Sequence, residues 1–345
     1  MRIINRDKIK EGKYKLMCTA LTLTTKEGYH LFGRNMDLEY SFNQAIDLVP
    51  RRFTYKNRAT NETETTKYAM IGMGIIMDNH PLFAEALNEK GLACAGLNFP
   101  GYAHWEEKVV EGKNNIPPYD VILWILGNFE TIEELKPELE KLNIVEKPFN
   151  ESTPLPTLHW IVTDKKGNCI VIEKTKEKLS IFDNKVGVLT NSPTFDWHIT
   201  NLNNYMGITP YQPSDMKWSD KQLKPLGQGS GGFGLPGDFS SPSRFVKAAF
   251  LRSNAVFSDT KDSGIIEFFH ILNGVAFVRG SVETPEQKKD ITQYTSCMCQ
   301  EKGIYYYNTY NNNQINVIDM NKENLDADQI KVFEYKDKLN LQYEN

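Results

Sequence analysis

The chain has 345 residues, a formal net charge of −4 and five cysteines. It contains no long block of lysine and arginine, and no apolar run reaches the roughly 20 residues of a membrane-spanning helix, so its composition predicts neither a nucleic-acid nor a membrane partner. An odd and sparse set of cysteines argues against a disulfide framework and favours a reducing compartment, the cytoplasm.

Residues 1–17 differ in character from the rest of the chain. The first sixteen are basic, but they lack the continuous apolar core of a secretory signal. Two interpretations stay open: a propeptide that is cut off before Cys18, or an unused upstream start, with translation beginning at Met17. We favour the second, because Lys10-Glu11-Gly12 can be encoded by a bacterial ribosome-binding sequence a short distance before Met17.

The first predicted strand covers residues 17–24, where Leu21 and Leu23 fall on one face and Cys18 and Thr22 on the other. Without Met17, Cys18 would carry a thiol with a pKa of about 8.5 and an α-amino group with a pKa of about 7.7 to 8.0. A thiol with a base in reach is a competent nucleophile, and the chain terminus itself can be that base. The alternative is the more common role of a strand cysteine, a small buried apolar residue.

Residues 26–28 predict a turn into a second strand over residues 29–33, which would deliver Arg34 and Asp37 to the strand end beside Cys18. A guanidinium group favours a thiolate, and a carboxylate can hold and orient an ammonium group. The alternative for this pair is a solvated salt bridge of little energetic value.

The remaining elements follow from apolar periodicity and from turn and cap residues. Strands are predicted over residues 45–49, 68–77, 92–99, 158–164, 169–173, 186–190, 296–300, 304–310 and 314–319. Helices are predicted over residues 119–129, from the capping box at 131–134 towards 142, from near Arg244 after the serines at 240–243, and over 265–272.

Polar residues at the ends of these elements are candidates for the site. Asn98 and Asn191 each end a predicted strand, where an amide can donate to a developing oxyanion or form an ordinary turn. His159 is a possible base for Cys18 or a hydrogen-bonded core histidine. Arg244 lies in the first turn of a helix, where a cation opposes the helix dipole, so local packing or an anionic partner is expected there.

Sequential hairpins, with helices grouped in the middle of the chain and no β-α-β alternation, predict an α+β protein with antiparallel sheets. Residues 227–232 match a dinucleotide-binding fingerprint, but prolines flank them where a strand and a helix are needed, so a flexible loop is expected. Cys297 and Cys299 lack a second pair at ligand spacing, so we expect no zinc site. No repeat or linker interrupts residues 18–345, which predicts one domain.

Seven short motifs in a fixed order resemble the choloylglycine hydrolase family. They are MCT at 17–19, FGRNMD at 32–37, NEKGL at 88–92, GLNFP at 96–100, LTNSP at 189–193, GLPGD at 234–238 and SRF at 243–245. Within the family the chain looks most like bile salt hydrolases of the clostridial type, and the resemblance runs from Met17 to the C-terminus.

The resemblance implies an N-terminal nucleophile hydrolase, a four-layer αββα sandwich that needs no metal or organic cofactor. By this analogy Cys18 is the nucleophile, with Arg34 and Asp37 beside its thiol and amine. Asn98 and Asn191 match the positions that stabilise the oxyanion, and Arg244 matches the remaining arginine of the family's site. While residues 1–17 stay attached, Cys18 has an amide nitrogen and no base, so the unprocessed chain is expected to be inactive.

The implied reaction is hydrolysis of glycine- or taurine-conjugated bile salts through a thioester on Cys18. Met36, Met77, Ala84 and Asn98 are the expected substrate-binding residues, although Met77 stands where the family leads us to expect an aromatic side chain. The resemblance also implies a homotetramer, with residues 201–232 as a projecting assembly loop.

Three alternatives remain. Penicillin V acylases share the fold and nucleophile, but they tend to carry an aromatic residue at the position of Asn98, which favours bile salts here. Acylases of N-acyl homoserine lactones cleave the same kind of bond. A protein that binds steroids without turnover is the third alternative, and it belongs to a different functional class. If the α-amino group were not the base, His159 would again be the candidate base for Cys18.

Overall fold

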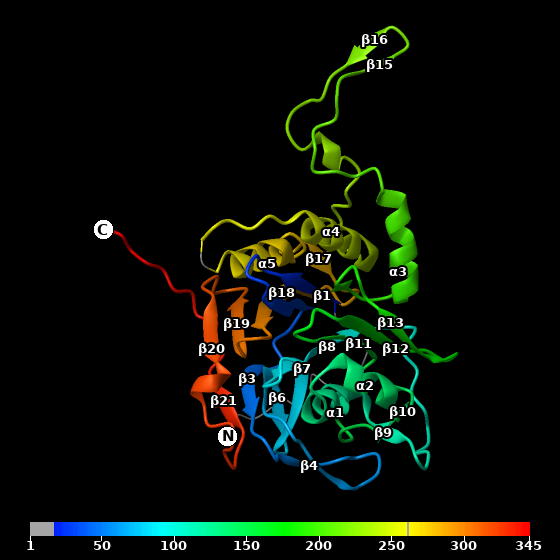
Figure 1. The fold of residues 1–345 in the computed structure, drawn as a ribbon, viewed down its shortest axis with the longest axis vertical. Helices are drawn as coiled ribbons and strands as arrows, with labels where there is room; N and C mark the ends of the chain where they lie inside the picture. The colour runs from blue at the N-terminus through cyan, green and yellow to red at the C-terminus, as the bar shows by residue number, and fades with distance from the viewer. Residues whose placement is uncertain (1–16, 261) are drawn as a thin grey trace.

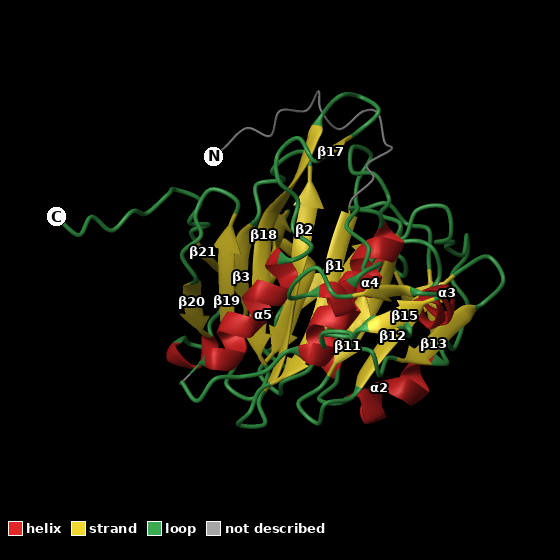
Figure 2. Cartoon of the chain, turned by 90° about the horizontal axis from the view of Figure 1, so that it is seen from above, coloured by secondary structure: helices red, strands yellow, loops and turns green. Residues whose placement is uncertain are grey.

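The computed structural model describes residues 17–260 and 262–345. Two antiparallel sheets lie face to face, and helices cover the outer face of each sheet (Figure 1). The helices α4 (Ser241–Asn254) and α5 (Ser263–Asn273) cover one sheet, as the view from above also shows (Figure 2). The helices α1 (Val121–Asn128) and α2 (Ile132–Leu139) cover the other. This order of layers is the expected αββα sandwich.

The first sheet has seven strands within the described residues. Its order is β14 (Val188–Leu189), β1 (Met17–Thr24), β2 (His30–Leu38), β18 (Lys289–Cys299), β19 (Ile304–Thr309) and β20 (Asn316–Asp319), with β17 (Val282–Glu283) paired to β18. The turn between β1 and β2 contains Gly28 at a φ of 86°, a left-handed conformation that glycine adopts without strain. The predicted hairpin is confirmed, and it sets Cys18 opposite Met36.

The second sheet has eight strands in the same described part of the chain. Its order is β13 (Leu179–Asp183), β12 (Cys169–Lys174), β11 (Leu158–Thr163), β8 (Ala93–Asn98), β7 (His80–Asn88), β6 (Met70–Met77), β3 (Ala45–Val49) and β21 (Lys331–Phe333). One hydrophobic core lies between the sheets and extends under α4 and α5, and a second lies between this sheet and α1 and α2.

The small sheets complete the fold. They are β4 (Thr54–Lys56) with β5 (Thr63–Thr65), β9 (Asn114–Ile116) with β10 (Leu142–Ile144), and β15 (Met216–Trp218) with β16 (Lys221–Leu223). The β9 and β10 pair is parallel, which the expected antiparallel architecture did not include. The predicted helix towards residue 142 was wrong at its end, because α2 stops at Leu139 and the chain then enters β10.

One sequence prediction about strands was also wrong, and one central strand was missed. Arg34 and Asp37 do not follow the end of the second strand, because β2 continues through both residues to Leu38 and pairs with β1 from His30 to Asp37. The central strand β7 was missed, because Glu85 interrupts its apolar pattern. β7 also carries a β-bulge at Ala84, opposite Met73 and Gly74 of β6, which disturbs the regular alternation further.

The cap predictions were confirmed. The Ser240 hydroxyl accepts a hydrogen bond from the Ser243 amide at 3.4 Å and begins α4, and the Thr131 hydroxyl accepts from the Glu134 amide at 3.3 Å and begins α2. The α4 cap fixes where Arg244 lies, because it places that residue in the first turn of the helix that covers β1.

After α3 (Phe195–Asn201) the chain leaves the body as a long arm that carries β15 and β16 (Figure 1). The glycine-rich residues 227–232 lie in this arm and hold a single 3-10 turn at Ser230–Gly232, so the prediction of a loop there is confirmed. No helix in residues 17–260 or 262–345 is both long and apolar enough to cross a membrane.

Asp47 on β3 provides a test of the sheet's energetics. Its side chain is 1% exposed, and neither carboxyl oxygen has a hydrogen-bond partner among the described residues. Burial raises its pKa from 3.8 to about 7. The folded state therefore keeps a proton that the unfolded state loses, so the stability that this proton supplies is complete below pH 4 and is lost as the pH rises through 7.

We expect Asp47→Asn to unfold at a higher urea concentration than the parent at about pH 8, and at the same concentration near about pH 4. Between these limits the difference between the two unfolding free energies should grow by up to about 1.4 kcal/mol per pH unit. Urea unfolding at several pH values measures this difference. A constant offset between the two proteins would contradict the assignment of a buried neutral carboxyl group.

Candidate active site

The site is built around Cys18, near the start of β1 at one end of the two facing sheets. The side chain is buried, and the backbone N–H donates to Asn191 Oδ1 at 2.9 Å. In this chain that nitrogen belongs to the peptide bond with Met17. The same nitrogen would be the α-amino group if Cys18 were the first residue.

Arg34 lies on β2 and is fully buried. Its Nη2 donates to the Cys18 sulfur, and its Nη1 donates to the carbonyl oxygens of Gly96 at 2.6 Å and Ala84 at 3.2 Å. Both carbonyls belong to the second sheet. Arg34 therefore connects the two sheets and directs a permanent positive charge at the thiol.

Asp37 lies three residues further along β2, opposite Met17. Its Oδ1 accepts from the Thr292 hydroxyl at 2.6 Å, whereas its buried Oδ2 has no hydrogen-bond partner among the described residues. Burial raises the pKa of Asp37 to about 6, against the opposing effects of Arg244, Thr292 and Arg34.

Asn191 and Arg244 close the other side of the thiol. Arg244 Nη2 donates to Asn191 Oδ1 at 2.7 Å, and Nη1 donates to the Cys18 carbonyl and to Thr19 Oγ1. Asn191 Nδ2 donates to the Asn98 carbonyl at 2.8 Å. These bonds fix the orientation of the Asn191 amide, and its Nδ2 has a second hydrogen that can face a substrate oxygen.

Asn98 is the last residue of β8, at the strand end where the sequence pattern predicts it. Its side-chain Oδ1 accepts from Thr157 at 2.7 Å, and its backbone N–H faces the Cys18 thiol. The six predicted catalytic residues are thus brought together from β1, β2, β8, the residues after β14, and α4.

The pKa of the Cys18 thiol reflects opposing causes. Burial raises it, Arg34 lowers it, Asp37 raises it, and Arg244 and the Asn98 amide lower it, with a net shift above the ordinary value. A raised pKa keeps the thiol protonated at neutral pH, so attack on a carbonyl requires a base for its proton.

His159 does not offer that base. Its Nδ1 lies 3.0 Å from Glu173 Oε1 and its Nε2 lies 3.0 Å from the Thr190 carbonyl, and the ring stacks on Phe99. Both nitrogens are engaged in the core, so the histidine has a structural role and the interpretation as a Cys18/His159 pair loses its support.

The expected substrate-binding residues are more dispersed. Met36 is buried beside the thiol, with its sulfur 3.6 Å from Arg34 Nη2, and half-buried Ala84 gives its carbonyl to the same guanidinium. Met77 lies at the end of β6, where Asn150 Nδ2 contacts its sulfur at 3.3 Å.

Sequence reasoning missed four polar residues of the site. Thr292 binds Asp37, and Glu85 accepts from the hydroxyls of Tyr294 at 2.9 Å and Tyr305 at 2.7 Å behind Arg34. A single glutamate within the apolar stretch at residues 82–87 was the available signal. No group of three or more histidine, cysteine or acidic residues that could hold a metal ion is found in residues 17–260 and 262–345.

Comparison with known proteins identifies the family. The profile of the linear amide C–N hydrolases, choloylglycine hydrolase family, matches residues 18–333. The chain belongs to the choloylglycine hydrolase family. The family match begins at Cys18.

Relatives within the family are similar over nearly their whole length. The chain is 57% identical over 329 residues to a bile salt hydrolase/transferase of Clostridium perfringens, covering 95% of this chain and 100% of the relative. It is 43% identical to a bile salt hydrolase/transferase of Lactiplantibacillus plantarum, covering 91% and 95%.

Solved structures agree with the family assignment. A crystal structure of conjugated bile acid hydrolase from C. perfringens superposes with a TM-score of 0.90 at 56% identity, covering 95% of this chain and 100% of that one. Penicillin V acylase from Agrobacterium tumefaciens, at a TM-score of 0.72 and 21% identity, shares the fold. The predicted family and N-terminal nucleophile hydrolase fold are confirmed, and the protein is an amidohydrolase.

Thr292→Val should shift the pH dependence of this amidohydrolase. The Thr292 hydroxyl stabilises ionised Asp37, so its removal raises the pKa of Asp37 above about 6. If ionised Asp37 is required, the acidic limb of the kcat/KM profile moves to higher pH by about 0.5 to 1 unit. Thr295→Val is the matched control, because this buried threonine of the same strand binds neutral Asn35. Equal profiles for the two variants would contradict the role of Asp37.

Proposed function

We propose that this protein hydrolyses the amide bond of glycine- or taurine-conjugated bile salts. The observation that carries the proposal is the buried cluster of Cys18, Arg34, Asp37, Asn191 and Arg244 in a chain 57% identical to a bile salt hydrolase/transferase. The family supplies the reaction class, linear amide cleavage. The relatives' names supply the substrate class.

In the first half of the proposed reaction the Cys18 sulfur attacks the amide carbonyl carbon. The thiol proton passes to the α-amino group of Cys18, and the carbonyl π electrons move onto oxygen. The Asn191 amide and the Asn98 backbone N–H stabilise that oxyanion, while Arg34 stabilises the sulfur. The tetrahedral intermediate then breaks its C–N bond, and the α-ammonium group gives its proton to the departing glycine or taurine nitrogen.

In the second half a water molecule attacks the thioester, with the same α-amino group taking one of its protons. The C–S bond breaks, the bile acid leaves as a carboxylic acid, and the thiol is restored. An amine could replace water at this step and form a new amide, which fits the hydrolase/transferase names of the relatives. Asp37 has a buried oxygen to accept from the α-ammonium group, and Arg244 holds Asn191 in place.

The mechanism requires a free amine, so we propose that the mature protein begins at Cys18. Either residues 1–16 would be an untranslated upstream stretch and Met17 a removed initiator, or residues 1–17 would be a removed propeptide. Residues 18–345 would be the single enzymatic domain. The start of the family match at Cys18 and the close contact of the Cys18 nitrogen with Asn191 both support this assignment.

Substrate binding is proposed for Met36, Met77, Ala84 and Asn98. Met36 lies opposite Cys18 in the sheet, and Ala84 binds the same guanidinium as the thiol through its carbonyl. Both side chains are apolar, which suits the steroid end of a bile salt. Met77 contacts Asn150 at the end of β6 and would act at the more distant part of the ligand.

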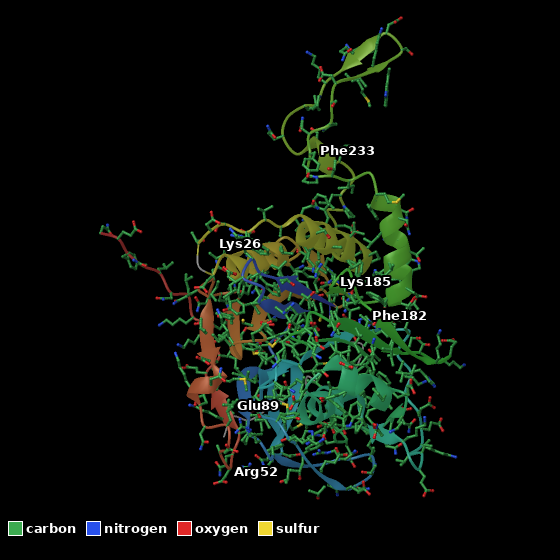
Figure 3. All side chains as sticks on the ribbon, viewed as in Figure 1. Lys26, Arg52, Glu89, Phe182, Lys185 and Phe233 are labelled. Carbon is green, nitrogen blue, oxygen red and sulfur yellow. The ribbon has the colours of Figure 1, made fainter. Side chains whose placement is uncertain are left out.

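We further propose a homotetramer in the cytoplasm. The arm exposes large apolar side chains, among them Trp218 at 70%, Leu226 at 103% and Phe233 at 93%, and Phe233 lies on the arm apart from the layered body (Figure 3). Such side chains are typical of a surface that another subunit covers. The five cysteines are all free thiols, which suits a reducing compartment.

The substrate assignment predicts selective turnover. Protein that begins at Cys18 should release glycine from glycocholate or taurine from taurocholate at least about tenfold faster than it cleaves penicillin V. Amine release measured side by side tests this, with Cys18→Ala as the inactive control. Faster cleavage of penicillin V or of an N-acyl homoserine lactone would change the substrate class, and steroid binding without turnover would favour a binding protein.

The mechanism also predicts that the start of the chain controls activity. A protein that retains residues 1–17 should have kcat/KM lower by at least about 10³-fold than one that begins at Cys18, because its Cys18 nitrogen is an amide without basicity. Mass spectrometry must confirm each N-terminus before the assay. Equal turnover by both forms would refute the α-amino group as the base.

A further inference from the structure

Glu85 is a buried carboxylate that the proposed mechanism leaves without a role. It lies on β7 of the second sheet, is 0% exposed and points into the space between the sheets. Its contacts come from three strands of the first sheet: Arg34 on β2, Tyr294 on β18 and Tyr305 on β19. A charged group this deep is stable only when its partners compensate the lost hydration.

The two tyrosines hold the carboxylate in a fixed position. Tyr294 donates to Oε2 at 2.9 Å and Tyr305 donates to Oε1 at 2.7 Å, and the Ser296 side chain adds a further hydrogen bond to the carboxyl group. Oε2 also lies 3.9 Å from Arg34 Nε. The carboxylate is therefore close enough to balance the charge of Arg34, while the tyrosines and Ser296 carry its hydrogen bonds.

The two Nη atoms of Arg34 make further contacts, one of them with Cys18. The bulge at Ala84, the residue before Glu85, turns the Ala84 carbonyl to Arg34 Nη1, so β7 contacts the guanidinium twice. Arg34 Nη2 donates to the Cys18 sulfur. The guanidinium therefore interacts with both the Glu85 carboxylate and the Cys18 thiol.

We propose that Glu85 is a positioning residue that holds Arg34 against Cys18 and shares the charge of the guanidinium with the sulfur. The inference rests on the proposed role of Cys18 as nucleophile. Two anions, Glu85 and a Cys18 thiolate, interact with one cation. Glu85 therefore weakens the electrostatic attraction between Arg34 and the thiolate. The pKa of the thiol is then lowered less, and the thiol stays protonated until a base removes its proton.

Other charged and polar groups also face Cys18 and Glu85. Cys18 is faced by Asp37 from β2 and by Arg244 from α4. Glu85 is faced by Arg34, by the two tyrosines and by Ser296 of β18, whose side chain makes a hydrogen bond to it. Burial raises the pKa of Glu85, and Arg34, the tyrosine hydroxyls and Ser296 lower it in part. Asp37 and Arg244 stay unchanged in every variant of the test, so their effect is common to all of them.

A double-mutant cycle in protein that begins at Cys18 tests the proposal without any substrate. The variants are Glu85→Gln, Arg34→Gln and the double variant, and the measurement is the rate of Cys18 alkylation by iodoacetamide against pH, assigned by peptide mass spectrometry. Glu85→Gln should move the midpoint of that profile to lower pH by about one unit, because Arg34 then acts on the thiolate alone. In the Arg34→Gln background the same change should have little effect, because Arg34 no longer lowers the pKa of the buried Glu85, which then takes up a proton and carries no charge for Gln to remove.

Two controls separate positioning from general damage. Glu85→Asp keeps the charge and should restore the parent profile, and Asp47→Asn changes another buried carboxyl of the same sheet and should leave the profile unmoved. An equal shift in both Arg34 backgrounds, or no shift in either, overturns the proposal. Alkylation as expected without bile salt turnover would reject the proposed substrate and leave the role of Glu85 intact.

Stability gives a second measurement if Glu85→Gln folds poorly. Arg34→Gln leaves the Glu85 carboxylate buried without its cation, so the double variant should unfold at higher urea concentration than Arg34→Gln alone. A double variant no more stable than Arg34→Gln overturns the charge pairing.

Discussion

The buried guanidinium of Arg34 beside the thiol of Cys18 is the contact on which the rest of the site depends. A cation with no exposed surface must have every donor satisfied and its charge compensated, and β2 alone supplies too little for this. The second sheet provides the carbonyls of Gly96 and Ala84 and the carboxylate of Glu85. Arg34 can occupy its position only where both sheets face each other, so the electrostatic environment of Cys18 forms together with the core between them.

The fold also explains how short motifs far apart in sequence meet at one place. Cys18 is the second residue of β1, and Asn98 ends β8 of the opposite sheet. Asn191 comes two residues after β14, which pairs with β1. The Ser240 cap sets the first turn of α4, from which Arg244 reaches both Cys18 and Asn191. Each residue lies at or near the end of an element, where side chains can converge on a substrate without breaking a strand ladder.

Much of this could be predicted from sequence because the signals are local. The alternation of β1, the turn at Gly28, the capped starts of α2 and α4 and the motifs around Cys18, Arg34, Asn98, Asn191 and Arg244 depend on neighbouring residues alone. Strand β7 and Glu85 could not be found in this way, because a glutamate is compatible with a strand core only when distant residues neutralise it. Its partners lie 51, 209 and 220 positions away. The partners of Arg34 on the opposite sheet escaped prediction for the same reason, since a backbone carbonyl has no signature in the sequence.

The Cys18 nitrogen shows how the proposed start of the enzyme changes its chemistry with little change in structure. With Met17 attached, this nitrogen already donates to Asn191 Oδ1, and Arg244 donates to the same oxygen. An amide N–H and an ammonium group can make the same hydrogen bond, but only the amine can take up a proton from the thiol. The surrounding side chains would therefore need no rearrangement when Met17 is absent, because Arg34, Asn191 and Arg244 are held by contacts within the two sheets and α4. On the proposed mechanism, a chain that begins at Cys18 would differ from the longer one by one exposed basic nitrogen in a site that the fold has already assembled.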